Sequence, residues 1–187
     1  MHISNISMIG WLHSAACVIA FFAGTHNLFA AKGTPRHRFV GLSYFWSMIV
    51  LNLTSLTIFR FDIASFRPFM AGPHVFGLFH WFAVFTLASV LIGRYAAAHQ
   101  DRTVWAYTHP VAMVFSYYML IGGAINEAFA RVDALHALAL RSMHAANGHA
   151  VGAPLIGLTQ SAAMAAAFIL MLYFTAKVAL YRRAQRA

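Results

Sequence analysis

Four histidines, three inside long apolar segments and one just before such a segment, are the residues whose type and spacing could do chemistry. His13 and His80 each follow a glycine by three residues, in the matching stretches GWLH and GLFH. His37 and His109 each precede a Ser-Tyr pair. This double correspondence indicates a repeated helical hairpin. An ionisable side chain within a membrane-spanning segment is a functional-site hypothesis by default, because its burial in lipid is costly.

Two histidine pairs at two matched depths suit the binding of two b-type haems. Haem iron accepts axial imidazoles, and the macrocycle needs an apolar pocket. We expect His13 and His80 to hold an outer haem, and His37 and His109 an inner haem. At the rise of an α-helix, the two levels lie roughly 20 Å apart. The alternative at each position is a histidine that hydrogen-bonds to a neighbouring helix.

Several neighbouring residues could complete these sites. His26 could replace His37 as the inner ligand, although it lies on a different face of its helix from His13. Three glycines lie one turn from the predicted ligands: Gly10, Gly77 and Gly41. They could leave room for a flat ring, or they could serve ordinary close packing between helices.

Charged residues lie beside the predicted inner site and at one further position. Arg38 follows His37 directly, and Arg36 and Lys32 are close in sequence, so these cations could pair with haem propionates. Their alternative role is in membrane topology and headgroup contact. Glu127 is a carboxylate inside an apolar segment, where it could transfer a proton or contact a substrate. A hydrogen bond to a nearby tyrosine or histidine is its alternative role.

Other chemistries have weaker support in the sequence. Imidazole also suits copper or zinc, so a metal-binding or transport protein is the second interpretation. A structural subunit of a larger membrane complex is the third. The chain has one cysteine, Cys17, and it has no HExxH or Gly-rich nucleotide motif. A separate redox partner, a quinone or an external acceptor would therefore have to exchange electrons with it.

Membrane-spanning helices must position these histidines. The chain of 187 residues is 61% hydrophobic and only 9% charged, whereas soluble domains carry about 25% charged residues. Five segments are long enough to cross a bilayer core of about 30 Å: near 7–31, 39–59, 75–97, 105–129 and 154–180. We expect an all-α integral membrane protein. A four-helix core of two parallel hairpins plus a fifth span would form one transmembrane domain over residues 1–187.

Basic residues predict the orientation of the spans. The net charge is +9, but the basic residues form short clusters between apolar runs, which favours a lipid bilayer and excludes nucleic acid as the partner. The clusters place the N-terminus outside and the C-terminus in the cytoplasm, in the inner membrane of a bacterium. Thr34 and Pro35 are typical of a helix start, so the second span is expected to begin there. The loop 131–153 would then be external, and its first part would form an interfacial helix.

Three motifs carry a resemblance to a known family over about residues 10–130. They are KGTPRHR, FHW and HPVAMVFSY, of the forms KGTxxHR, FHW and HxxxMxxSY. In these motifs the chain resembles a family of small bacterial integral membrane proteins that is filed as a domain of unknown function. That resemblance implies a multi-span membrane protein and no settled activity. The placement of histidines on alternate spans is also similar in arrangement to cytochrome b561, where two haems lie in a four-helix core.

Overall fold

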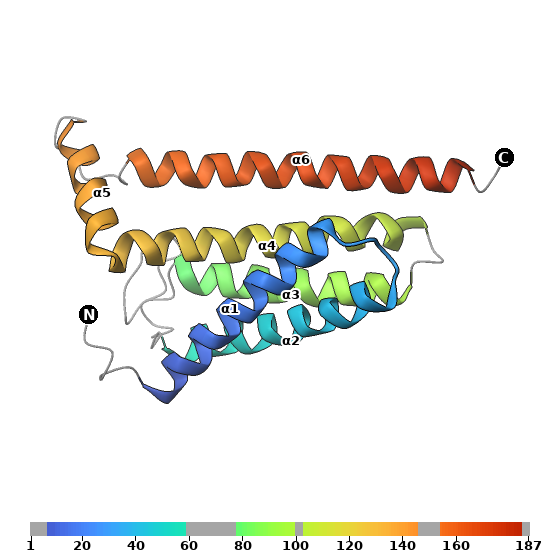
Figure 1. Ribbon diagram of the computed structural model, residues 1–187, viewed down its shortest axis with the longest axis horizontal. Coiled ribbons are helices and arrows are strands. Elements are labelled where there is room, and N and C mark those ends of the chain that lie inside the picture. The colour runs from blue at the N-terminus through green and yellow to red at the C-terminus, as the bar shows by residue number, and fades with distance from the viewer. Residues whose placement is uncertain (1–6, 59–77, 100–102, 146–153, 185–187) are drawn as a thin grey trace. The chain divides into compact units, whose positions relative to one another are not determined.

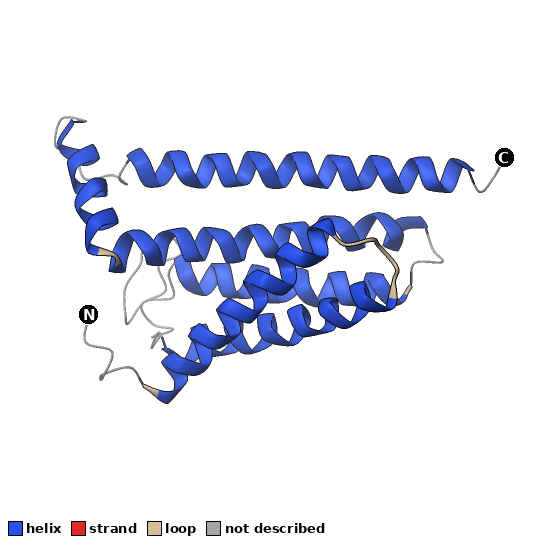
Figure 2. Ribbon diagram, in the orientation of Figure 1, coloured by secondary structure: helices blue, strands red, loops and turns tan. Residues whose placement is uncertain are grey.

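The computed structural model describes residues 7–58, 78–99, 103–145 and 154–184. Helices joined by short loops make up these residues, and no strand occurs among them (Figure 2). The helices are α1 (Met8–Phe29), α2 (Pro35–Ile58), α3 (Leu78–Ala98), α4 (Thr103–Arg131), α5 (Asp133–Ala145) and α6 (Pro154–Ala184). Within the described residues, all but α5 contain a segment long and apolar enough to cross a membrane. The prediction of an all-α chain with five spans is therefore confirmed.

The turn between α1 and α2 shows why these helices end and begin where they do. The Lys32 ammonium donates hydrogen bonds to Asn27 O and Leu28 O, at 2.5 and 2.9 Å, and so caps carbonyls at the end of α1. Gly33 follows with a φ of 78°, a left-handed conformation that glycine adopts without strain. Thr34 Oγ1 then accepts a 3.2 Å hydrogen bond from the backbone N–H of His37. The predicted helix start at Thr34 and Pro35 is confirmed.

The chain divides into two compact units, and the division falls within α4, after Tyr117. The N-terminal unit holds α1, α2, α3 and the first part of α4 (Figure 1). α2 packs against both α1 and α3. The largest fully buried side chains described in this unit are Met48 of α2, Val90 of α3 and Ser116 of α4, and Ala20 of α1 is also fully buried. The expectation of one transmembrane domain over residues 1–187 stays a prediction.

The C-terminal unit holds the rest of α4, α5 and α6. Leu135 and Ala139 of α5 pack in a small cluster with Phe129, at the end of α4, and with the start of α6. The predicted helix at the start of loop 131–153 is thus present. Leu135 is packed there, whereas Val132 and Leu138 are about half exposed, at 48% and 47%.

Candidate functional site

Three histidines gather at one end of the N-terminal unit. His26 lies in the last turn of α1 and His37 in the first turn of α2, so the short turn between these helices brings them together. His109 of α4 and His26 both lie within electrostatic range of His37. The structure therefore places the predicted inner pair, His37 and His109, near each other, and it adds the alternative ligand His26 to the same group.

The orientation of the His109 ring is determined by a backbone group of α3. His109 Nδ1 lies 2.8 Å from Gly93 O. A carbonyl oxygen can only accept, so Nδ1 carries the proton and donates it. The lone pair of the neutral ring is then on Nε2. A metal-binding histidine uses this same arrangement, because the hydrogen bond at one ring nitrogen fixes the tautomer and the direction of the other.

Three buried polar atoms near the turn between α1 and α2 have no hydrogen-bond partner among the described residues. They are His26 Nε2, Asn27 Oδ1 and His37 Nδ1. Buried polar groups are nearly always paired, and each unpaired one costs about 1–3 kcal/mol. Coordination of an imidazole nitrogen to iron would remove part of this cost. The donor set at this end therefore fits the ligation of a haem.

Three cations lie within electrostatic range of this inner group. Lys32 acts electrostatically on both His37 and His109, although its ammonium caps the end of α1. Arg38 also lies within electrostatic range of His37, and its side chain is exposed. Arg94 of α3 lies within range of His109. Arg94 is a residue that the sequence analysis did not connect with this site, because only the fold brings α3 beside α4.

The outer pair shows a similar ring orientation at one of its members. His13 Nδ1 lies 3.0 Å from Thr54 Oγ1 of α2. Thr54 Oγ1 is also 2.8 Å from Val50 O and 2.9 Å from Leu51 O, so its proton is directed to its own helix and its oxygen accepts from His13. His80 of α3 is buried, at 2% exposure. The structure thus gives His13 a partner on α2, which the sequence analysis did not identify.

A layer of hydroxyl groups lies two helical turns from His37 along α2 and from His109 along α4. Tyr44 OH is 2.9 Å from Ser116 Oγ, and Tyr117 OH is 2.6 Å from Thr25 Oγ1. The Ser116 and Thr25 hydroxyls donate their own protons to backbone carbonyls. The two tyrosine hydroxyls must therefore be the donors in these contacts. The Ser-Tyr pairs of the sequence therefore link α1, α2 and α4. Gly24 of α1 makes room for this layer, since a Cβ there would overlap the Tyr117 ring.

The remaining predicted residues have separate environments. A Cβ on Gly41 would lie 3.1 Å from Asn27 Nδ2, so Gly41 allows close packing of α2 against α1. Gly10 lies in the first turn of α1, where its N–H donates to Ser7 Oγ. Gly77 lies outside the described residues. Glu127 is partly buried in the part of α4 that belongs to the C-terminal unit.

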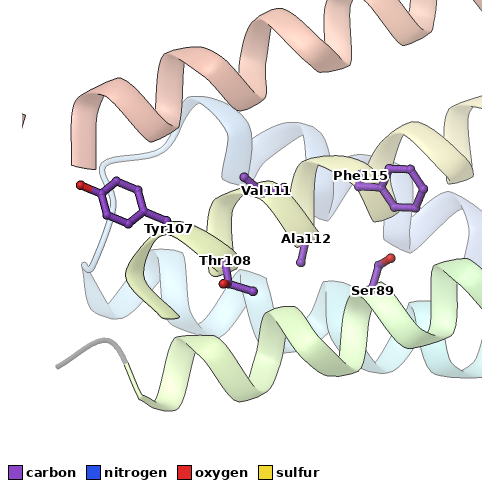
Figure 3. A pocket seen from close by; sticks show the side chains of 6 residues that line it. All are labelled: Ser89, Tyr107, Thr108, Val111, Ala112 and Phe115. Carbon is purple, nitrogen blue, oxygen red and sulfur yellow. The ribbon is translucent and has the colours of Figure 1, made fainter. Parts of the chain in front are cut away.

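The described residues contain no cluster of side chains that could hold a single metal ion. Among them, no three or more His, Cys, Asp or Glu side chains are placed to hold one metal ion. An open groove of about 360 Å³ lies between α3 and α4 (Figure 3). The Ser89 and Thr108 hydroxyls in its lining donate to carbonyls of their own helices. This mostly apolar surface suits contact with lipid.

Comparisons with known proteins add no relative to this description. No protein-family model, curated protein or solved structure matches the chain. The resemblance in its three motifs stays a prediction, and the functional argument depends on the residues of the site itself.

Proposed function

We propose that this chain is a membrane b-type cytochrome, which holds two haems at two depths and moves electrons across the bilayer. The observation that carries the proposal is the hydrogen bond from His109 Nδ1 to Gly93 O, 2.8 Å long. It leaves Nε2 as the nitrogen with the lone pair, as an axial ligand requires. When bound, haem supplies a one-electron redox centre.

The residues of the chain divide between the two haems. His109 and either His37 or His26 would hold the inner haem, and the buried unpaired atoms of His37 and His26 support both choices. His13 and His80 would hold the outer haem. The hydrogen bond from His13 Nδ1 to Thr54 supports His13 as a ligand, because it leaves the lone pair on Nε2. The contact of His109 with Gly93 has the same effect.

Haem fits these residues better than a single copper or zinc ion. A structural metal ion usually takes four protein ligands, and no group of three is placed for one in the described residues. A haem needs only two axial imidazoles from the protein, because the macrocycle supplies the other four ligands. The exposed Arg38 would pair with a propionate of the inner haem.

The membrane setting completes the proposal. The described helices support a multi-pass protein in a lipid bilayer. We place it in the bacterial inner membrane, with its N-terminus outside and its C-terminus in the cytoplasm. Electrons would come from or go to a quinone or an external acceptor, through a redox partner or a larger membrane complex.

Single substitutions test whether the two levels hold separate haems. The full chain is produced in haem-replete cells and purified in detergent, and haem content is measured for wild type, His109→Ala and His13→Ala. Each variant should retain one haem of two. His99→Ala is the matched control, because His99 follows the end of α3 and its Nδ1 bonds to Tyr95 O in the last turn of that helix, at 2.9 Å. Full haem content in His109→Ala would contradict the inner site.

A further inference from the structure

Gly93 is a buried glycine of α3 at which a side chain would collide with α4. A Cβ at this position would lie 2.6 Å from Met113 Sδ and 3.2 Å from Met113 Cγ. It would also lie 3.4 Å from Ala112 Cβ, an ordinary contact. Real Cβ atoms essentially never come within 3.0 Å of another heavy atom. The Met113 side chain therefore occupies the space that a Cβ on Gly93 would need.

The same glycine supplies the acceptor for His109. Its carbonyl oxygen receives the Nδ1 proton at 2.8 Å. Met113 follows His109 by four residues, so the two side chains lie on one face of α4, one turn apart. Both are directed to Gly93: Met113 to its Cα and His109 to its carbonyl. The distance between α3 and α4 at this point therefore determines both contacts.

We infer that Gly93 is a positioning residue for His109. Its missing side chain lets Met113 pack directly on the α3 backbone, and this packing keeps Gly93 O within hydrogen-bond distance of His109 Nδ1. The ring then presents Nε2 as the ligand nitrogen. This inference deepens the proposed function and rests on it for the ligand role of His109.

Close packing is not a property of every helical glycine in the chain. A Cβ built on Gly123 of α4 or on Gly157 of α6 meets nothing within 4 Å among the described residues. Gly93 differs from these two because it has a helix neighbour in contact and a carbonyl used by a side chain of another helix. Gly123 therefore offers a matched control for the loss of a helical glycine.

The test compares Gly93→Ala, Met113→Ala and the double variant in the full chain with ¹⁵N-labelled histidine. The His109 ¹⁵N shifts report which ring nitrogen carries the proton. Gly93→Ala should abolish the wild-type Nδ1–H signature. The double variant should restore it, because Met113→Ala vacates the space for the new Cβ. Gly123→Ala should retain the wild-type signature.

Haem binding is the second readout. Loss of a hydrogen bond that orients a metal ligand lowers metal affinity about 10- to 100-fold, so Gly93→Ala should weaken inner-haem binding by that factor. The double variant should bind within a few-fold of wild type.

Two results would overturn the inference: an unchanged His109 signature in Gly93→Ala, or a lost signature that the double variant does not restore. A failure of the proposed function has a different pattern. The signature would then respond as expected, while the wild-type chain bound no haem.

Discussion

At the two predicted sites, His13 and His109 each donate a hydrogen bond from the same ring atom, Nδ1. In each, Nδ1 donates to an acceptor on a different helix, Thr54 Oγ1 for His13 and Gly93 O for His109. The neutral ring then carries its lone pair on Nε2. Two predicted ligands with one orientation make a stronger argument for metal binding than two buried histidines alone.

The Thr54 hydroxyl gives a test of this orientation at the outer site. Thr54→Val keeps the shape of the side chain but removes the acceptor of the His13 proton. We expect outer-haem affinity to fall about 10- to 100-fold, as for other groups that orient metal ligands. Titration of the purified protein with haem measures this change.

Thr57→Val is the control for that variant. Thr57 Oγ1 donates to the carbonyl of Thr54, within its own helix, and the side chain is exposed. Its replacement should leave haem affinity unchanged. Equal affinities for the Thr54 and Thr57 variants would show that the His13 hydrogen bond has no part in binding.

The candidate site could be predicted from the sequence in part. The repeated spacing of His13, His80, His37 and His109 was visible because three of them interrupt apolar runs and His37 stands just before one. The groups that accept the hydrogen bonds of these histidines, Gly93 O and Thr54 Oγ1, could not be predicted from the sequence. Gly93 acts through its carbonyl, which every residue possesses, and Thr54 is one of several hydroxyl residues on its helix. Only the packing of helices distinguishes these two residues from their neighbours.

At the scale of the elements, the fold was predictable wherever hydrophobicity and helix caps determine it. Helix α2 begins at Pro35 because Thr34 caps it, and all five spans follow long apolar runs. The tyrosine layer was not predictable. The Ser-Tyr pairs marked a repeat, but their partners Thr25 and Gly24 lie on α1, and no local pattern connects them.

Gly24 provides a test of the packing of α1. Its Cβ would overlap the Tyr117 ring and lie 3.0 Å from Tyr44 Cε2. Each ring is also held by a hydrogen bond, Tyr117 to Thr25 and Tyr44 to Ser116, which a shift of the ring would disturb. We expect Gly24→Ala to destabilise the protein by about 1–3 kcal/mol, the usual cost of overpacking. Unfolding in detergent, followed by circular dichroism, measures this difference.

Gly123→Ala provides the matched comparison for Gly24. Its Cβ would enter open space among the described residues. Alanine favours a helix over glycine by about 1 kcal/mol, so this variant should be as stable as wild type or more stable. If both variants unfolded alike, the close approach of α1 to the tyrosine layer would be refuted.

At the scale of the whole molecule, the distribution of basic residues predicts the topology. Arg182 and Arg183 lie in the last turn of α6, and their charge favours the cytoplasmic side. In a Cys17→Ala background, a membrane-impermeant maleimide should label Asp133→Cys in intact spheroplasts. It should label Ala184→Cys only after the membrane is permeabilised. The reverse pattern would invert the proposed orientation.

The haem itself is the central claim, and one measurement tests it most directly. The full chain, purified from haem-replete cells, is oxidised and then reduced with dithionite, and the difference spectrum is recorded with the haem-to-protein ratio. We predict the absorbance change of a reduced b-type haem, with two haems per chain. A chain that is well folded but shows no haem absorbance would contradict the account.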